Sequence, residues 1–166
     1  MFISREIAGE LHQLIGEYPV VTVLGPRQAG KTTLVKSELE GYAYANLEDP
    51  ETRGIAEGDP NAFLSQFKGK VIIDEIQRVP DLLSYIQVAV DASSVNGQYV
   101  LTGSHQLSLR EAITQSLAGR TAILNLLPLS IRELDAAGIE MEAFEDYCFA
   151  GFLPRVYDQL QRPTAA

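Results

Sequence analysis

The sequence predicts an α/β fold, built on a mostly parallel sheet of about five strands with helices on both faces. Two observations lead to this prediction. Short apolar, β-branched segments alternate along the chain with longer segments that have helical periodicity. A glycine-rich turn also joins the first apolar segment directly to a helical one. Parallel strands joined through helices by right-handed crossovers give a doubly wound layer, with helices above and below the sheet.

After one leading helix, the predicted elements alternate between strand and helix. The candidate strands span residues 20–24, 42–47, 71–73, 98–104 and 121–127. The candidate helices span residues 4–17, 31–39, 59–67, 80–92, 107–117, 130–137 and 144–150. Ser4 is the candidate N-cap of the first helix, Gly41 follows the second, and Pro60 begins the third. The acidic residues 48–59 are expected to form a solvated surface segment.

The functional prediction depends on the loop formed by residues 25–32. Its sequence, GPRQAGKT, fits the pattern G-x-x-x-x-G-K-[ST] without a mismatch and lies between a predicted strand and a predicted helix. Gly25 and Gly30 let backbone N–H groups turn toward phosphate, and the helix N-terminus adds unpaired N–H groups. Lys31 is predicted to reach the β- and γ-phosphates, and Thr32 to place its hydroxyl on Mg²⁺.

This motif predicts that the fold is that of a P-loop NTPase. The residues predicted to contact the nucleotide are Gly25, Pro26, Arg27, Gln28, Ala29, Gly30, Lys31, Thr32 and Thr33.

Two carboxylates, Asp74 and Glu75, follow the apolar segment 71–73. In open α/β sheets, ligands bind at the carboxyl ends of the strands, where these side chains are expected. Asp74 is predicted to hold Mg²⁺ together with Thr32. Glu75 is predicted to orient the attacking water and to accept its proton. The two motifs together indicate an ATP site that carries out phosphoryl transfer to water.

Small polar residues end the neighbouring strand at Thr102 and Ser104. Either hydroxyl is placed to bond the γ-phosphate or the attacking water, but this spacing also suits an ordinary strand-to-helix turn. His105 follows directly and is a further candidate to be tested.

Two arginines are candidates for neutralising phosphate charge. Arg120 is predicted either to stabilise the equatorial oxygens of the γ-phosphate or to be a surface residue at the start of a strand. Arg27, inside the loop, is predicted to face either phosphate or a neighbouring subunit.

Composition limits the partners of the 166-residue chain. A formal net charge of −9 argues against binding of a nucleic-acid backbone over a broad face, because such binding uses clustered Lys and Arg. The single cysteine, Cys148, allows no internal disulfide and is expected to be a buried small hydrophobe. The N-terminus has no signal-peptide pattern, no apolar segment has the length of a membrane span, and a cytoplasmic location is expected.

Six motifs occur in the order GPRQAGKTTL, VIIDEIQ, YVLTGS, SLAGR, LPLSIRE and GFLPR. In this respect the chain resembles the prokaryotic AAA-type ATPases that are often labelled only as ATP-binding proteins, and the resemblance covers about residues 3–154. It implies that the phosphate-loop strand is central and that the strand ending in 102–104 lies between it and the Asp-Glu strand. It also implies that residues 25–32 bind nucleotide and Asp74 binds magnesium.

The resemblance also implies that Glu75 is the catalytic base. By the same resemblance, Thr102 or Ser104 is the sensor, beside both Lys31 and Glu75, and Arg120 is the arginine of the S-L-A-G-R segment. The family continues past residue 154 into a second domain. Residues 1–166 are therefore expected to be an ATPase core without its C-terminal domain, and nothing after Pro154 is expected to be long enough for a lid. A neighbouring subunit or that domain would complete the site, and turnover by the core alone is expected to be slow.

Three alternatives remain open at this point. The first is a nucleotide-gated binding module with little turnover. The second is a P-loop kinase for a small molecule, which would need an acceptor pocket and an arginine-rich lid. A GTPase is the third, although the sequence has no N-K-x-D guanine-reading segment.

Overall fold

The computed structural model describes residues 3–160 except Ser94 and His105. Its sheet has five strands: β1 (Val20–Gly25), β2 (Ala43–Asn46), β3 (Val71–Asp74), β4 (Tyr99–Ser104) and β5 (Thr121–Asn125). Their order is β2-β3-β4-β1-β5, and every pairing is parallel. The predicted fold class is confirmed, and β4 lies between β1 and β3 as the resemblance implied.

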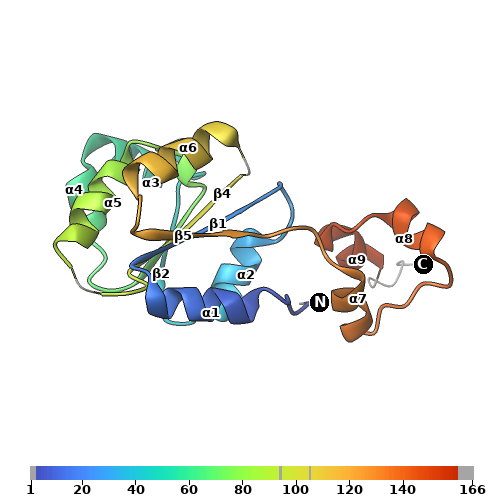
Figure 1. Ribbon diagram of the computed structural model, residues 1–166. Helices are drawn as coiled ribbons and strands as arrows, with labels where there is room; N and C mark the ends of the chain where they lie inside the picture. Colours follow the sequence, from blue (N-terminus) through green and yellow to red (C-terminus); the bar gives the residue numbers. More distant parts are fainter. Residues whose placement is uncertain (1–2, 94, 105, 161–166) are drawn as a thin grey trace.

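Two layers of helices cover the two faces of this sheet (Figure 1). One face carries α1 (Ala8–Glu17) and α2 (Lys31–Glu38). The other carries α3 (Pro50–Gly58), α4 (Pro60–Ser65), α5 (Leu82–Asp91) and α6 (Leu107–Ser116). Strands β1, β3 and β4 are buried along their whole length, as expected for parallel strands covered on both faces.

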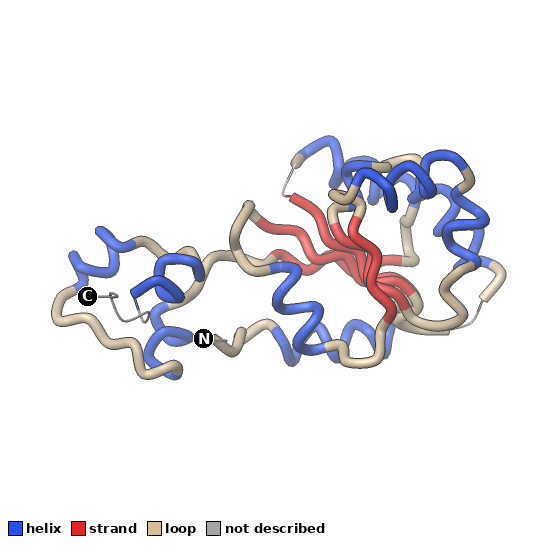
Figure 2. The backbone as a smooth tube through the Cα atoms, turned by 180° about the vertical axis from the view of Figure 1, so that it is seen from behind, coloured by secondary structure: helices blue, strands red, loops and turns tan. Residues whose placement is uncertain are grey.

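A small helical unit lies beside the sheet rather than over either face, as Figure 2 shows from behind. It contains α7 (Ile131–Ala136), α8 (Phe144–Ala150) and α9 (Pro154–Leu160). Its core is separate from the two cores of the sheet and includes Leu134, Tyr147 and Tyr157, with Ile3 from the N-terminal segment. The capping box of Ser130 and Glu133 begins α7.

Two predictions about local structure were wrong, and two helices were not predicted. Ser4 is not an N-cap: α1 begins at Ala8 after an irregular segment, in which the buried Arg5 makes long-range contacts. The acidic segment 48–59 is largely exposed, as predicted, but it also contains the helix α3, which Asp49 caps by accepting from the Thr52 N–H. The helix α8 ends before Gly151 as predicted, and a further helix, α9, begins at Pro154. Cys148 is exposed, because α8 packs on its unit through Tyr147 instead.

Among the described residues, no helix is long and apolar enough to cross a bilayer. The cytoplasmic location and the division into a core and an absent C-terminal domain stay predictions.

Candidate nucleotide-binding site

The loop between β1 and α2 has the backbone geometry that its glycines predict. A Cβ atom at Gly25 would overlap the carbonyl oxygen of Leu126, so the close approach of these backbones requires glycine. Gly30 has φ +93° at the N-cap of α2, another position that favours glycine. The start of α2 therefore presents unpaired backbone N–H groups beside the loop, an arrangement suited to anions.

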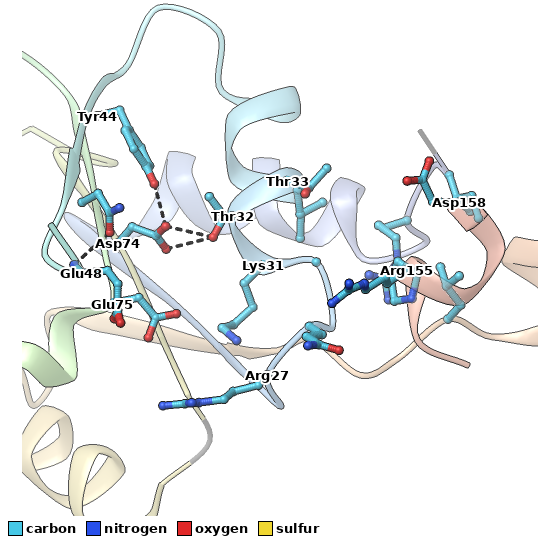
Figure 3. A pocket seen from close by; sticks show the side chains of 18 residues that line it. Arg27, Lys31, Thr32, Thr33, Tyr44, Glu48, Asp74, Glu75, Arg155 and Asp158 are labelled. Atoms are coloured by element: carbon cyan, nitrogen blue, oxygen red, sulfur yellow. Dashed lines mark hydrogen bonds between the residues drawn. The ribbon is translucent and has the colours of Figure 1, made fainter. Parts of the chain in front are cut away.

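A cavity of about 810 Å³ opens at this helix start (Figure 3). Its lining comes from three regions: the loop with the start of α2, the ends of β2 and β3, and the helical unit with the N-terminal segment. The lining residues are Ile3, Arg5, Arg27, Gln28, Gly30, Lys31, Thr32, Thr33, Leu34, Tyr44, Asn46, Glu48, Asp74, Glu75, Leu129, Pro154, Arg155 and Asp158.

Lys31 is only 6% exposed and its ammonium group is folded back onto the loop. Its Nζ donates to the carbonyl oxygens of Gly25 at 3.0 Å and Pro26 at 2.9 Å. Burial lowers the pKa of Lys31, and the nearby carboxylates of Glu75 and Asp74 oppose that shift. Lys31 is thus a buried cation held by backbone carbonyl oxygens at the cavity, an arrangement that favours binding of an anion.

Asp74 is buried and accepts hydrogen bonds from three side-chain hydroxyls. The Thr32 hydroxyl donates to its Oδ2 at 2.9 Å, and the Tyr44 hydroxyl donates to the same oxygen at 2.7 Å. The Thr102 hydroxyl donates to Oδ1. Figure 3 shows the Tyr44 and Thr32 bonds converging on the carboxylate. Burial and the bond to Asp74 raise the pKa of Tyr44, so its hydroxyl stays a donor at neutral pH.

Glu75 has a left-handed backbone conformation, with φ 61° and ψ 47°. A non-glycine residue in this region stores strain, which persists only where surrounding contacts fix it. Its N–H donates to the Thr102 hydroxyl at 3.2 Å, and its carboxylate accepts from the Gln77 amide. The conformation turns the chain between β3 and the short 3₁₀ helix Ile76–Arg78, so that Glu75 lines the cavity beside Lys31.

The two hydroxyls at the end of β4 differ in their contacts. Thr102 bonds Asp74 and the Glu75 N–H, so it supports the carboxylates. Ser104 is 6% exposed, lies opposite Gly25 in the sheet register, and its Oγ has no hydrogen-bond partner among the described residues. A buried hydroxyl without a partner can still form a hydrogen bond with a ligand or a water. The candidate His105 lies outside the described residues.

The predicted loop contacts divide into two groups. The cavity is lined by Arg27, Gln28, Gly30, Lys31, Thr32 and Thr33. Gly25, Pro26 and Ala29 instead shape the backbone: the first two accept from Lys31, and the Ala29 carbonyl accepts from Arg5.

Arg120 lies at the amino ends of the strands, whereas the cavity lies at their carboxyl ends, so Arg120 cannot reach a nucleotide in this cavity. It precedes β5, and its carbonyl accepts from the N–H of Val20 at the beginning of β1. The glycine loop follows the other end of β1, about 16 Å away for a strand of this length. The Arg120 guanidinium pairs with Asp91 at 2.5 and 2.9 Å. The prediction that Arg120 contacts phosphate within the same chain was therefore wrong. Arg120 instead forms a surface ion pair with Asp91.

The helical unit supplies a wall of the cavity that the sequence did not predict. Pro154, Arg155 and Asp158, at the start of α9, line it. These residues belong to a helix that faces the loop (Figure 3), and the expectation that nothing after Pro154 is long enough for a lid stays a prediction.

Arg5 connects that helical unit to the loop. Its guanidinium donates to the Ala29 carbonyl at 2.8 Å, to the Leu127 carbonyl at 2.7 Å and to the carboxylate of Glu133 at 3.0 Å. Both charged side chains are about 6% exposed. Burial alone would raise the pKa of Glu133, but hydrogen bonds from the Ser130 and Glu6 N–H groups, with Arg5, hold it below its usual value. Glu133 ends the LPLSIRE motif, but nothing in the sequence pairs it with Arg5, so only the folded structure identifies the pair.

A parallel sheet with a glycine loop leading into a helix, and an Asp-Glu pair two strands away, defines the P-loop ATPase class. The chain belongs to the AAA domain family, whose model matches residues 17–135. It is 35% identical over 141 residues to the uncharacterized proteins Rv2008c of Mycobacterium tuberculosis and Mb2031c of Mycobacterium bovis. The match covers 82% of this chain but 31% of those proteins, so the chain spans about a third of their length.

Solved structures with the same fold are more distant in sequence. The Walker-type ATPase PABY2304 of Pyrococcus abyssi gives a TM-score of 0.61 at 17% identity, over 92% of this chain and 65% of that one. AMPPCP-bound DnaA from Aquifex aeolicus gives 0.59 at 14% identity, over 96% of this chain and 61% of that one. The similarity of these two structures shows the P-loop fold.

Proposed function

We propose that this domain binds ATP together with Mg²⁺ and hydrolyses ATP to ADP and phosphate. The observation that carries the proposal is the convergence of Lys31, Thr32, Asp74 and Glu75 on one cavity at the start of α2. These groups come from chain segments that are far apart in sequence, and each has the chemistry that one part of a nucleotide requires.

The phosphates would lie on the N–H groups of the loop and of the first turn of α2. Lys31 would exchange its two carbonyl partners for oxygens of the β- and γ-phosphates, a better match for an ammonium group. The Aquifex aeolicus DnaA structure, which has the same fold, is AMPPCP-bound, and this is consistent with nucleotide binding here.

The residues also fit a magnesium ion. Thr32 and Asp74 are in contact at 2.9 Å on the cavity side, a hydroxyl and a carboxylate that are both oxygen ligands. Mg²⁺ is commonly held by one or two protein oxygens together with substrate phosphates. When bound, it would supply charge neutralisation on the β- and γ-phosphates.

Hydrolysis requires a group that orients water in line with the γ-phosphorus. Glu75 would accept a proton from that water while the water oxygen forms its bond to phosphorus and the bond to the ADP oxygen breaks. Ser104 is the hydroxyl we assign to the water or the γ-phosphate, because Thr102 is already committed to Asp74. Arg27 and Arg155, which both line the cavity, would add positive charge on the phosphates.

The test is Glu75→Gln, compared with wild type and with Glu57→Gln on the exposed side of α3. ATP affinity is expected to stay near that of wild type in both variants. Turnover by Glu75→Gln is expected to fall by roughly 10²-fold or more, as is usual when a general base is lost. The measurements are ATP binding by calorimetry and phosphate release under saturating ATP.

If wild type and Glu75→Gln release phosphate at the same measurable rate, Glu75 is not the base. If neither exceeds the rate without protein while both bind ATP, hydrolysis is excluded in favour of a nucleotide-gated binding module. Phosphate transfer to a small molecule would instead indicate a kinase. Phosphate release should also be measured against protein concentration, because we expect a neighbouring subunit or a further domain to raise the rate.

A further inference from the structure

We propose that Tyr44 is a positioning residue for Asp74, whose hydroxyl fixes the carboxylate in the orientation needed to hold magnesium. This inference rests on the proposed function, since it concerns the same metal site. Nothing in the glycine-loop or Asp-Glu motifs includes Tyr44, which lies on a different strand.

The sheet register brings Tyr44 to this carboxylate. Strand β2 is the edge strand next to β3, and Asn46 is paired with Asp74. Because side chains alternate along a strand, Tyr44 and Asn46 lie on the same side, and both line the cavity. The Tyr44 hydroxyl then reaches Asp74 Oδ2 at 2.7 Å.

The ring of Tyr44 is itself held in place. The ammonium of Lys36, on the second turn of α2, lies 3.5 Å from the ring centroid, a cation–π contact. Helix α2, which begins at the glycine loop, therefore positions both candidate magnesium ligands. It carries Thr32 itself, and it positions Asp74 through the contact of Lys36 with Tyr44. A tyrosine that only covered the edge of the sheet would need no such bond to the carboxylate.

The donors around Asp74 have separable tasks. Thr32 bonds both carboxylate oxygens and would turn to the metal as a ligand. Two donors then remain, Thr102 on Oδ1 and Tyr44 on Oδ2, one for each oxygen. Such outer hydrogen bonds set the plane of a ligating carboxylate, and their loss commonly costs 10–100-fold in metal affinity.

Tyr42 offers a matched control. It lies just before β2, its hydroxyl donates to the Gly97 carbonyl at 3.0 Å, and Lys70 lies near its ring. Tyr42→Phe thus removes one tyrosine hydroxyl hydrogen bond from the same region without touching Asp74.

The experiment titrates ATP binding with Mg²⁺ in wild type, Tyr44→Phe and Tyr42→Phe, with binding in EDTA as the baseline. The Mg²⁺ concentration for half-maximal enhancement is expected to rise about tenfold in Tyr44→Phe and to stay within twofold in Tyr42→Phe. Binding without metal is expected to be equal in all three. In an Asp74→Asn background, adding Tyr44→Phe is expected to change nothing further.

A half-maximal Mg²⁺ concentration in Tyr44→Phe that matches Tyr42→Phe would overturn the inference and leave the proposed function intact. The inference also fails, again without touching the proposed function, if Tyr44→Phe has its full effect in the Asp74→Asn background. If ATP binding by wild type did not depend on Mg²⁺ concentration, the result would contradict both the proposed function and this inference.

Discussion

The cavity has two walls of different origin. One wall is made by the glycine loop and the carboxyl ends of the strands, where polar residues follow fully buried apolar segments. The other is made by α9 and the N-terminal segment, which belong to a separate small core. The strand wall is specified by the glycine-loop and Asp-Glu motifs, whereas the helical wall depends on contacts between distant segments.

The difference extends to how each wall is stabilised. The sheet is covered by helices on both faces, so the strand wall rests on the two large cores. The helical unit leaves Phe144 and Phe149 of α8 exposed and is tied to the loop through Arg5 and Glu133. We therefore expect the helical wall to be the more sensitive to a single substitution away from the predicted nucleotide contacts.

Glu133→Gln should have the largest effect on the helical wall. It leaves the buried Arg5 guanidinium without its counter-charge, and loss of one partner of a buried ion pair costs about 3–5 kcal/mol. For a chain of this size the corresponding decrease in Tm is roughly 10 °C. Thermal unfolding followed by circular dichroism measures it, with the exposed Glu140→Gln as the control. A decrease in Tm no larger than that of the control would show that the Arg5–Glu133 ion pair does not stabilise the protein.

The same pair predicts a pH dependence with a definite sign. Because the folded-state pKa of Glu133 lies below its usual value of 4.5, its contribution to stability is present above pH 4.5. That contribution is lost as the pH falls through the folded-state value. The difference in unfolding free energy between wild type and Glu133→Gln should therefore be constant above pH 4.5 and should shrink below it. A difference that grows on acidification would contradict this assignment.

Arg120→Ala should have the smallest effect, and it tests which end of the sheet carries the site. Since Arg120 pairs with Asp91 at the amino ends of the strands, ATP affinity measured at low protein concentration should stay within about twofold of wild type. A tenfold loss of ATP affinity or turnover that appears only at high protein concentration would show that Arg120 acts on a neighbouring copy.

The sequence was sufficient for the fold and for the strand wall, because both depend on local patterns. The order of buried strands and helices predicted the parallel sheet, and the loop and the Asp74–Glu75 pair lie where those patterns place them. Arg120 could have been placed correctly from the sequence, since a residue that precedes a parallel strand lies at the edge opposite the loop.

Other features needed the folded chain. Arg5 and Glu133 are 128 residues apart and were invisible as a pair. Tyr44 is 30 residues from Asp74, and the only signal in the sequence was its alternation with Asn46 on a strand predicted to end at the same edge. Helix α9 was missed because it begins at Pro154, in the glycine–proline segment 151–154, which indicates a break but not that a new helix begins there.

The central claim is that the strand wall binds the phosphates of ATP through Lys31. Calorimetric titration with ATP and Mg²⁺ of wild type, Lys31→Ala and the exposed control Lys68→Ala tests it most directly. We predict binding by wild type and Lys68→Ala, and a loss of about 100-fold or more in a folded Lys31→Ala, because this lysine meets phosphate charge. Unchanged ATP affinity in a folded Lys31→Ala would contradict the claim.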